Sequence, residues 1–276
     1  MKIVKVLNNN TVATITNDNK EAIIQGLGIG FQKKPGDLID EIKIEKIFIF
    51  NDGERNQFEE LLKDTPIDFF KLAKDIVVKT KNDLNITLNN KILISLTDHI
   101  SFALERYKQG IPLPSLMLDD IKILYPKEYE IGLWALNRIN KNLNVNLDND
   151  EAGYLTLHIL NAKLNVAKDQ TINIIRMCKD VMSIIEKIYD INLKEKSINY
   201  LRIITHLKYL AQKIFTKENN RFIGTDDLYD LIIKKDNNLS LCINLISDYI
   251  NLNFSYDLSK DDKVYLMIHI LRIIKK

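Results

Sequence analysis

The four histidines of this 276-residue chain fall into two matched pairs. His158 and His269 stand near the ends of two similar stretches, Glu151 to Ile159 (E-A-G-Y-L-T-L-H-I) and Asp262 to Ile270 (D-K-V-Y-L-M-I-H-I). His99 lies upstream of the first stretch and His206 upstream of the second. The pattern repeats after roughly 110 residues. This period indicates duplicated domains rather than a solenoid, whose repeats are about 20 to 50 residues long.

A neutral histidine can accept a phosphoryl group through one ring nitrogen. The phosphorylated ring carries about two negative charges, which repel carboxylates, attract arginine and so bias an interface between two states. A lone histidine in a helix is more often an ordinary structural residue, but four histidines in matched positions favour a function. We therefore predict that His99, His158, His206 and His269 are phosphorylation sites in two sensor domains.

The other chemistries of histidine fit less well. Neither pair has the i, i+4 spacing of a local zinc site, and a carboxylate seven residues before its histidine is about 10.5 Å away along a helix. Glu151 and Asp262 would therefore act, if at all, through another helix or another subunit. No G-x-S-x-G motif, Cys-His pair or P-loop is present. We expect no metal, no cofactor and no catalytic site.

The neighbours of the histidines have two interpretations each. Tyr154 and Tyr265 lie one helical turn before a histidine, so they either hydrogen-bond to it or pack in a core, which is more common. Asp98 precedes His99, and Arg106 follows one heptad later on roughly the same helical face; these neighbours are either part of the switch or a solvated surface.

The composition is that of a globular protein with two or three domains. Hydrophobic residues make up 46% of the chain, and 39 basic residues nearly balance 37 acidic ones, so a nucleic-acid partner must be argued locally. Cys178 and Cys242 lack metal-ligand spacing and are expected to be reduced core residues. No apolar run reaches the roughly 18 residues of a membrane span, and no secretion signal is recognisable, so we expect a cytoplasmic protein without membrane insertion.

The first 50 residues have the pattern of strands. Ile3 to Leu7, Thr11 to Thr16 and Glu21 to Gln25 are separated by asparagine-rich turns, and Ile42, Ile44, Ile47 and Phe48 suggest a last strand. Glycines cluster at Gly26, Gly28, Gly30 and Gly36. A β module this small gains core by pairing with a second copy, which favours a homodimer.

Helical periodicity begins at Phe58, Leu61 and Leu62 and continues through Ile92, Leu96, Ile100 and Ala103 to the C-terminus. We expect breaks at Pro66, Gly110–Pro114, Pro126, Asn140–Asp150, Lys168–Gln170, Lys217–Thr225 and Asp236–Asn238. The predicted fold is multidomain, with a small all-β antiparallel N-terminal domain (1–56) followed by two duplicated all-α helical bundles (57–170 and 171–276).

The motifs in this order closely resemble those of the transcriptional antiterminators of the BglG and LicT type. The motifs are M-K-I-V-K-V-L-N-N-N, G-L-G-I-G-F-Q-K-K-P-G-D at Gly26 to Asp37, D-H-I at Asp98 to Ile100, and the two Y-L-x-x-H-I motifs. The resemblance covers the whole chain. It implies a dimeric co-antiterminator domain that binds an RNA hairpin in a leader mRNA, and two phosphotransferase-system regulation domains, phosphorylated on histidine by the phosphocarrier protein and the sugar-specific permease.

The resemblance also implies an RNA-contacting set in the N-terminal domain. Asparagine and glutamine suit base edges and 2'-hydroxyls, phenylalanine can stack on an unpaired base, glycine lets the backbone approach, and Lys5, Lys33 and Lys34 can neutralise phosphates. The predicted RNA-binding residues are Lys5, Asn8, Asn10, Gly26, Gly28, Phe31 and Gln32. From the residues alone, Asn8 to Asn10 would be a hairpin turn.

This chain departs from the family pattern in two places. Leu27 stands where the family often has Arg or Lys, and His206 follows Thr205 whereas His99 follows Asp98. The rival functions are a DNA-binding transcription activator with the same regulation domains, which needs a helix-turn-helix, and a phosphotransfer enzyme, which needs a substrate-pocket motif.

Overall fold

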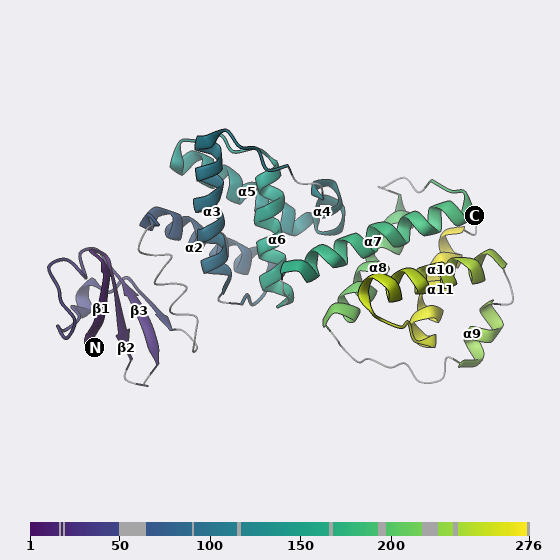
Figure 1. Cartoon of the computed structure of the whole chain (residues 1–276), viewed down its shortest axis with the longest axis horizontal. Coiled ribbons are helices and arrows are strands. Elements are labelled where there is room, and N and C mark those ends of the chain that lie inside the picture. Colours follow the sequence, from purple (N-terminus) through teal and green to yellow (C-terminus); the bar gives the residue numbers. More distant parts are fainter. Residues whose placement is uncertain are drawn as a thin grey trace. The chain divides into compact units, whose positions relative to one another are not determined.

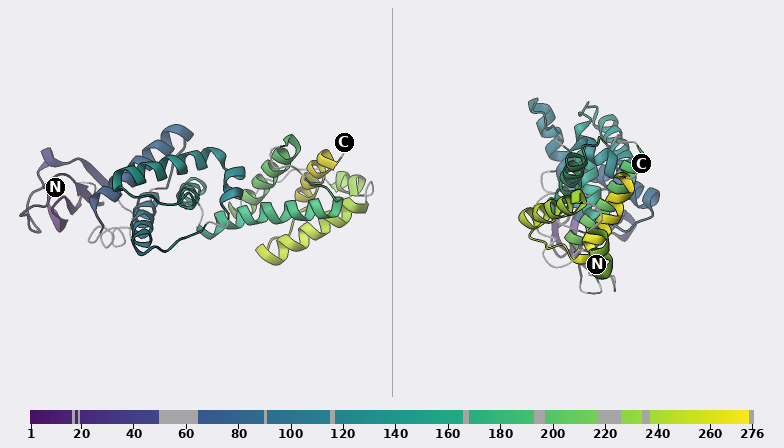
Figure 2. Two further views of the ribbon diagram at one scale, coloured as in Figure 1. Left: turned by 90° about the horizontal axis from the view of Figure 1, so that it is seen from above. Right: turned by 90° about the vertical axis from the view of Figure 1, so that its right-hand side faces the viewer.

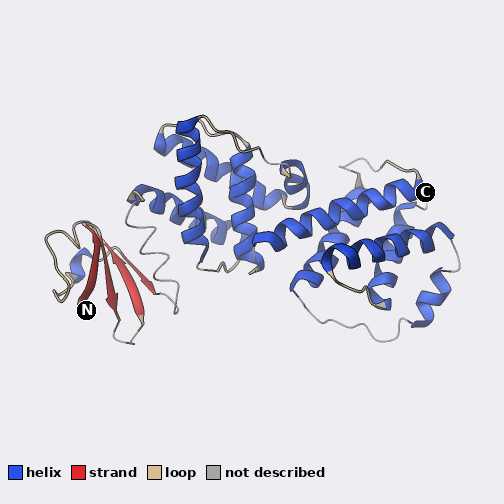
Figure 3. Ribbon diagram, viewed as in Figure 1, coloured by secondary structure: helices blue, strands red, loops and turns tan. Residues whose placement is uncertain are grey.

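The computed structural model describes residues 1–16, 18, 20–49, 65–89, 91–114, 117–165, 168–192, 197–216, 226–233 and 237–274. Strands come first along the chain and helices follow, as predicted (Figure 3). The chain divides into two compact units. The first comprises residues 1–85, 89–112 and 138–147, and the second comprises residues 86–88, 113–137 and 148–276.

The first unit begins with a four-stranded antiparallel sheet in the order β1-β2-β3-β4 (Figure 1). Its strands are β1 (Ile3–Asn8), β2 (Thr11–Ile15), β3 (Glu21–Gln25) and β4 (Lys46–Ile49). The buried residues that form its core are Ile3, Val12, Ile24, Ile29 and Ile39. Short strands joined by Asn-rich turns therefore fold as the alternation predicts, which confirms the all-β N-terminal domain.

The last strand is shorter than predicted. Ile42 lies in the 3-10 helix η1 (Glu41–Lys43), where its side chain is 97% exposed, and Ile44 follows that helix. The Asp40 carboxylate accepts a hydrogen bond from the backbone N–H of Ile42. Such a local side-chain cap competes with strand pairing, so the prediction of strand at Ile42 and Ile44 is wrong, while Ile47 does lie in β4.

Helices α2 (Ile67–Leu84) and α3 (Lys91–Gln109) pack together in the first unit, which also contains the last residues of α5 (Pro126–Leu143). The buried face of α3 consists of Ile92, Leu96, Thr97, Ile100 and Ala103, in agreement with the predicted periodicity. Arg138 of α5 forms an ion pair with Asp75 of α2, with 2.9 Å between Nη2 and Oδ2. The predicted helical residues Phe58, Leu61 and Leu62 lie outside the described residues.

The second unit is helical and has one large core. Its helices are α4 (Leu118–Leu124), most of α5, α6 (Asp150–Leu164), α7 (Lys168–Tyr189), α8 (Ile198–Thr216), α9 (Asp226–Ile233), α10 (Asn237–Phe254) and α11 (Lys260–Ile274). The long helix α7 packs against α8 and α10, and α11 packs against α8 and α9 (Figure 2). Cys178 and Cys242 are buried and reduced, as predicted. Among the described residues, no helix combines the length and hydropathy needed to span a bilayer.

Most predicted breaks that fall on described residues agree with the helix ends. Pro66 precedes α2, Pro126 begins α5, and a loop separates α5 from α6. The break predicted near Lys168–Gln170 is present but slightly displaced, because α7 already begins at Lys168. The chain stops being helical earlier, at Asn165, whose φ of 52° is the left-handed conformation that ends many helices. Asn237 and Asn238 already belong to α10, while Lys217–Thr225 and Asp236 lie outside the described residues.

Candidate functional sites: a histidine pair and a glycine-rich loop

His206 of α8 and His269 of α11 lie against each other in the second unit. Their imidazole rings stack with centroids 3.3 Å apart and planes inclined by 16°. Both side chains are half-buried. The structure therefore brings together the two predicted histidines of the second block, although they are far apart in the sequence.

Tyr265 contacts both rings of this pair. Its hydroxyl lies 2.7 Å from Nδ1 of His206 and 3.5 Å from the backbone carbonyl oxygen of the same residue. Its ring meets that of His269 edge to face, with centroids 4.6 Å apart. Of the two interpretations left open for Tyr265, the hydrogen bond to a histidine is present, but it joins Tyr265 to His206 on another helix rather than to His269.

The hydrogen bond at Nδ1 determines which nitrogen of His206 is available for chemistry. When the tyrosine O–H donates to the His206 carbonyl, the tyrosine oxygen accepts from Nδ1–H, and Nε2 then keeps its lone pair. Which tautomer forms is set by the bond that the other nitrogen makes. In that tautomer, Nε2 is the ring nitrogen whose lone pair is not engaged by Tyr265.

Both rings are held in the neutral form. Burial, the neighbouring His206 ring and the Arg272 guanidinium together lower the pKa of His269 to about 4. Burial and Arg272 also lower the pKa of His206 below its ordinary value. A neutral imidazole has the lone pair that a phosphoryl acceptor requires, so the pair is prepared for nucleophilic chemistry near pH 7.

A second contact joins the same two helices. Lys213 of α8 donates to the carboxylate of Asp262 of α11 across 2.7 Å, and Asp262 is buried. Lys213 lies seven residues after His206, and Asp262 lies seven residues before His269. The two contacts therefore show that α8 and α11 are antiparallel. Asp262 acts on another helix and not on its own histidine, as predicted from the helix rise.

Asp262 also holds the start of α11. Its carboxylate accepts hydrogen bonds from the N–H and hydroxyl of Ser259 and from the hydroxyl of Tyr256. Burial alone would raise the pKa of Asp262, but the bonds from Lys213 and Ser259 outweigh it and lower that pKa. This residue is ionised and anchors the helix that carries His269.

In the first block, the two predicted histidines, His99 and His158, lie on different helices. His99 is half-buried in α3 of the first unit, and His158 is half-buried in α6 of the second. The Tyr154 hydroxyl donates to the carbonyl of Pro114 across 3.2 Å. The sequence repeats the spacing of the second block, with Arg106 seven residues after His99 and Glu151 seven residues before His158.

Except for Lys5, which lies in β1, the predicted RNA-contacting residues lie where the β1–β2 turn meets the glycine-rich loop, residues Gly26 to Gln32. The side-chain oxygen of Asn10 accepts a hydrogen bond from the N–H of Gly28 across 2.7 Å. The side-chain oxygen of Asn8 accepts from the N–H of Asn10 across 2.9 Å. Each asparagine oxygen thus fixes the backbone, and the amide NH₂ group remains as the part of Asn10 suited to a base.

The glycines of this loop serve the fold itself. A Cβ atom added to Gly26 would lie 1.7 Å from the backbone oxygen of Lys43, so only glycine fits there. Gly28 has open space around it but adopts a φ of +66°, which disfavours other residues. The close backbone approach predicted at Gly26 is therefore an approach to the chain's own backbone.

The glycine-rich loop and the residues near it expose several large side chains. Phe31 is 57% exposed and Leu27 is 77% exposed, while Gln32, Lys34 and Lys5 of β1 are also exposed and Lys33 is partly exposed. An exposed phenylalanine beside exposed amide and ammonium groups suits an RNA surface, where aromatic rings stack on bases and cations meet phosphates.

The sequence did not predict the contacts on the face of α8 opposite His206. There the ammonium group of Lys208 donates to the carbonyl of Leu124 across 3.1 Å and lies 5.0 Å from the centre of the Tyr125 ring. Burial lowers the pKa of Lys208 despite the nearby Glu128 carboxylate. No spacing signal marks this lysine, because its partners lie at the junction of α4 and α5, which only packing brings close.

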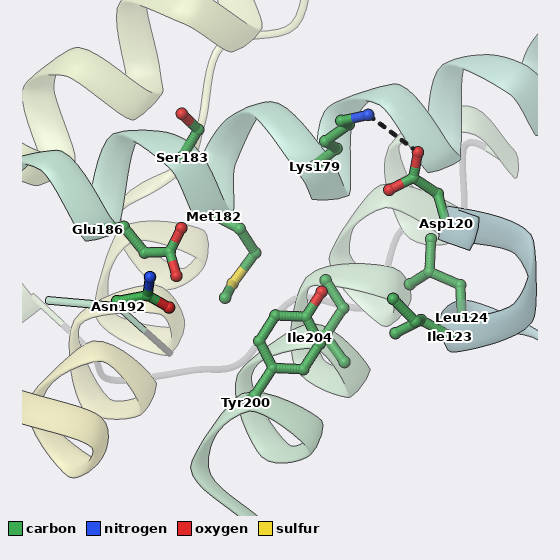
Figure 4. Close-up of a pocket in the computed structure, with 10 residues that line it drawn as sticks. All are labelled: Asp120, Ile123, Leu124, Lys179, Met182, Ser183, Glu186, Asn192, Tyr200 and Ile204. Carbon is green, nitrogen blue, oxygen red and sulfur yellow. Dashed lines mark hydrogen bonds and ion pairs between the residues drawn. The ribbon is translucent and has the colours of Figure 1, made fainter. Parts of the chain in front are cut away.

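A cavity of about 310 Å³ opens beside this contact, between α4, α7 and α8 (Figure 4). At its edge, Lys179 of α7 forms an ion pair with Asp120 of α4 across 3.1 Å. Tyr200 and Ile204, on the same helix as His206, line the cavity. Helix α8 therefore presents one face to α11 and another to α4.

Comparisons with known proteins match the N-terminal β domain and both helical blocks. Residues 1–57 match the family model described as the CAT RNA binding domain, and residues 74–162 and 179–273 each match the PRD domain. The transcription antiterminator LicT of Bacillus subtilis (strain 168) is 37% identical over 278 residues, covering all of both chains. The beta-glucoside operon antiterminator of Dickeya chrysanthemi is 35% identical, covering 99% of this chain and 96% of the relative.

A solved structure is also similar. The crystal structure of GlcT CAT-PRDI has a TM-score of 0.51 and 35% sequence identity, covering 59% of this chain and 97% of the other. This similarity, together with the sheet and helices described above, confirms the predicted fold class of a small antiparallel β domain followed by helical bundles.

Proposed function

This chain belongs to the BglG and LicT family of transcription antiterminators, and we propose how its residues perform that function. It binds an RNA hairpin in an operon leader, prevents the terminator from forming, and is regulated by histidine phosphorylation from the sugar phosphotransferase system. The rival DNA-binding activator needs a helix-turn-helix, whereas the described residues among the first 49 form four strands, a 3-10 helix and connecting loops. The role is regulatory rather than enzymatic.

The RNA surface that we propose consists of the β1–β2 turn and the glycine-rich loop. Phe31 stacks on an unpaired base, Gln32 and the amide group of Asn10 donate to base edges or 2'-hydroxyls, and Lys5, Lys33 and Lys34 meet phosphates. Asn8, Gly26 and Gly28 keep the loop in the shape that presents these groups. Leu27 adds an exposed apolar contact in place of a cation.

A titration of the full chain with the leader RNA of the operon it controls tests this surface. We expect salt-sensitive binding to the intact hairpin and weaker binding to the same RNA with one hairpin arm scrambled. Phe31→Ala should weaken binding about tenfold or more, the effect of losing one stacked base. Equal binding to the intact and scrambled RNA would exclude hairpin recognition.

The phosphorylation site that we propose in the second block is the His206–His269 pair. The supporting observation is that Tyr265 holds Nδ1 of His206 while both rings are neutral. The lone pair of Nε2 attacks the phosphoryl group of the donor's phosphohistidine. The P–N bond of the donor breaks as the new P–N bond forms, and its electron pair returns to the donor ring.

The remaining partners follow from the same scheme. We propose that the phosphocarrier protein phosphorylates His206 or His269 and activates, and that the sugar-specific permease phosphorylates His99 or His158 and inhibits when its sugar is absent. A phosphate favours the state whose interface offers it cations, and the two states of the homodimer differ in that respect. Because the target is a nascent leader RNA, the protein acts in the cytoplasm.

Phosphorylation of the purified full chain with the phosphocarrier system tests the second half of the scheme. We expect phosphoryl groups on His206 or His269, located by mass spectrometry under conditions that preserve phosphohistidine. His206→Asn together with His269→Asn should abolish incorporation from the phosphocarrier protein, while a parallel reaction with the sugar-specific permease should still phosphorylate His99 or His158. Unchanged incorporation in that double variant would place the acceptor elsewhere.

A further inference from the structure

Arg272 lies on α11 one helical turn after His269, so the two side chains share a face of the helix. Its side chain is exposed. In the part of the chain that the structure describes, no acidic side chain forms a salt bridge with it. An arginine that stands beside two neutral rings without an anion is positioned for an anion that arrives later.

The positive charge of Arg272 acts on both histidines. It contributes to lowering the pKa of His269 and that of His206, although these residues belong to different helices. Because the rings are stacked 3.3 Å apart, one guanidinium on α11 lies close enough to influence either ring. A phosphoryl group on either ring would therefore meet the same cation.

Lys213, another cation of these two helices, is already engaged. Lys213 lies about two helical turns from His206, roughly 10.5 Å along the axis, and its ammonium group is bound to the buried Asp262. Moving Lys213 to a phosphate would leave the Asp262 carboxylate buried without its cation, which is costly. Arg272 has no such competing contact among the described residues.

The first block differs at this position. Three residues after His158, in the place of Arg272, stands Asn161, which is half-buried and uncharged. The two blocks share the histidine, the tyrosine and the carboxylate of the Y-L-x-x-H-I motifs but not the arginine. A phosphate in the first block therefore lacks this helical partner, so the two blocks need not respond to phosphorylation in the same way.

We propose that Arg272 is the positioning residue that holds the phosphoryl group on His206 or His269 through its guanidinium. This inference rests on the proposed phosphorylation of that pair. A guanidinium matches phosphate oxygens with two parallel N–H donors, and such charge-assisted bonds are among the strongest in proteins. The phosphorylated form of the second block is then stabilised within α8 and α11, without a cation from another protein.

The test compares the full-length chain with Arg272→Gln, Arg272→Lys and the control Arg176→Gln. Arg176 is an exposed arginine of α7, so its replacement removes the same charge from the same unit. Each variant is phosphorylated with the phosphocarrier system, the donor is removed, and the phosphohistidine remaining at His206 and His269 is followed by mass spectrometry.

We expect the phosphoryl group on Arg272→Gln to be lost about tenfold faster than on the unmodified chain, the effect of one charged hydrogen-bonding partner. Arg272→Lys should be intermediate, because lysine supplies the charge without the paired donors. Arg176→Gln should match the unmodified chain. A melting curve of each unphosphorylated variant shows whether it is folded, and Arg272→Lys carries the test if Arg272→Gln is not.

Three results would overturn this inference, and a fourth concerns the proposed function. Equal loss rates in all variants, or a change in the forward transfer rate alone, would show that Arg272 does not hold the product. Faster loss from Arg176→Gln as well would reduce the effect to net charge, which also rejects a specific role. Absence of any phosphoryl group on His206 and His269 in the unmodified chain would instead refute the proposed function itself.

Discussion

The rings of His206 and His269 stack with their centroids 3.3 Å apart, and both have lowered pKa values. These two facts are connected, because two protonated rings at this distance would repel each other strongly. Burial is the main cause of both lowered pKa values, and the neighbouring His206 ring adds to it at His269. A neutral ring of this kind has the lone pair that the proposed phosphoryl acceptor requires.

The first prediction concerns acid. The pKa of His269 is about 4 in the folded chain, against about 6.5 in an unfolded one. Between these values the unfolded state binds a proton that the folded state does not, so the free energy of unfolding falls as the pH falls from 6.5 towards 4. With a discount for partial exposure, the loss is about 1 to 2 kcal/mol.

Chemical denaturation across this pH range measures the free energy of unfolding. Hydrogen exchange of amides in the second unit shows whether the change is local to that unit. His269→Asn keeps a side chain of similar size without a titrating group, and its stability should depend less steeply on pH. Asp262, whose pKa is lowered from 3.8, contributes in a separate window at lower pH. The same slope in His269→Asn and in the unmodified chain would contradict the assignment to His269.

Tyr265→Phe removes the hydroxyl that binds Nδ1 of His206 and keeps the ring that meets His269. We expect the free energy of unfolding to fall by about 1 kcal/mol, the net contribution of one hydrogen bond. Phosphorylation of His206 should also become slower, because the tautomer with Nε2 unprotonated is no longer selected. Rates of phosphoryl transfer from the phosphocarrier protein measure this.

Tyr256→Phe is the matched control for Tyr265→Phe. It removes a tyrosine hydroxyl bound to Asp262 rather than to a histidine. Its loss of stability should be similar, whereas transfer to His206 should be unchanged. If both variants slow the transfer equally, the effect of Tyr265 is general destabilisation and not control of the tautomer.

Lys213→Met leaves the Asp262 carboxylate buried without its ammonium partner. Removing one member of a buried pair costs about 3 kcal/mol. By contrast, Lys122→Met breaks the exposed pair with Asp119 on α4 and should cost less than about 0.5 kcal/mol. Denaturant titrations give both values, and a small effect of Lys213→Met would show that water or another cation replaces the lysine.

Gly26→Ala and Gly28→Ala separate two reasons for glycine in the same loop. At Gly26 the new Cβ would meet the Lys43 backbone oxygen, so we expect a loss of about 3 kcal/mol or more in the stability of the sheet. At Gly28 only the positive φ is penalised, at about 1 kcal/mol. Hydrogen exchange of the β2 and β3 amides in the full chain reports local stability. Equal protection in both variants would show that the loop shifts to accommodate the added methyl group of Gly26→Ala.

His99→Ala tests the inhibitory half of the scheme. Without an acceptor in α3, the permease cannot inhibit through that residue, so we expect antitermination whether or not the sugar is present. A reporter gene behind the leader and terminator measures this, and His269→Ala in the same assay should lower activity. Normal repression in His99→Ala would count against an inhibitory role for that histidine.

The sequence predicts the elements well because each depends on local pattern. The helical period of α3 and the asparagine turns of the sheet are visible in neighbouring residues. The predictions fail where a local hydrogen bond or a left-handed residue overrides the pattern of apolar residues. Asp40 caps a 3-10 turn where Ile42 and Ile44 suggested a strand, and Asn165 ends α6 before the break predicted at Lys168.

The site could be predicted only in part. Spacing identified the histidines and excluded a direct contact between Asp262 and His269. It could not show that Tyr265 bonds to His206, since that contact depends on how α8 packs against α11. Nor could it show that the oxygen of Asn10 is used by Gly28, because eighteen residues separate the two. The partners of a side chain on a neighbouring element follow from tertiary packing.

The antiparallel contacts of α8 and α11 have one further consequence. The His206–His269 stack and the Lys213–Asp262 ion pair are set by the same alignment of the two helices. If α11 slid by one turn, about 5.4 Å, both contacts would break together and neither would be replaced in kind. The two helices therefore pack in one well-defined register, without intermediate positions. We therefore expect the proposed phosphorylation to stabilise or separate this helix pair and not to shift it by small steps.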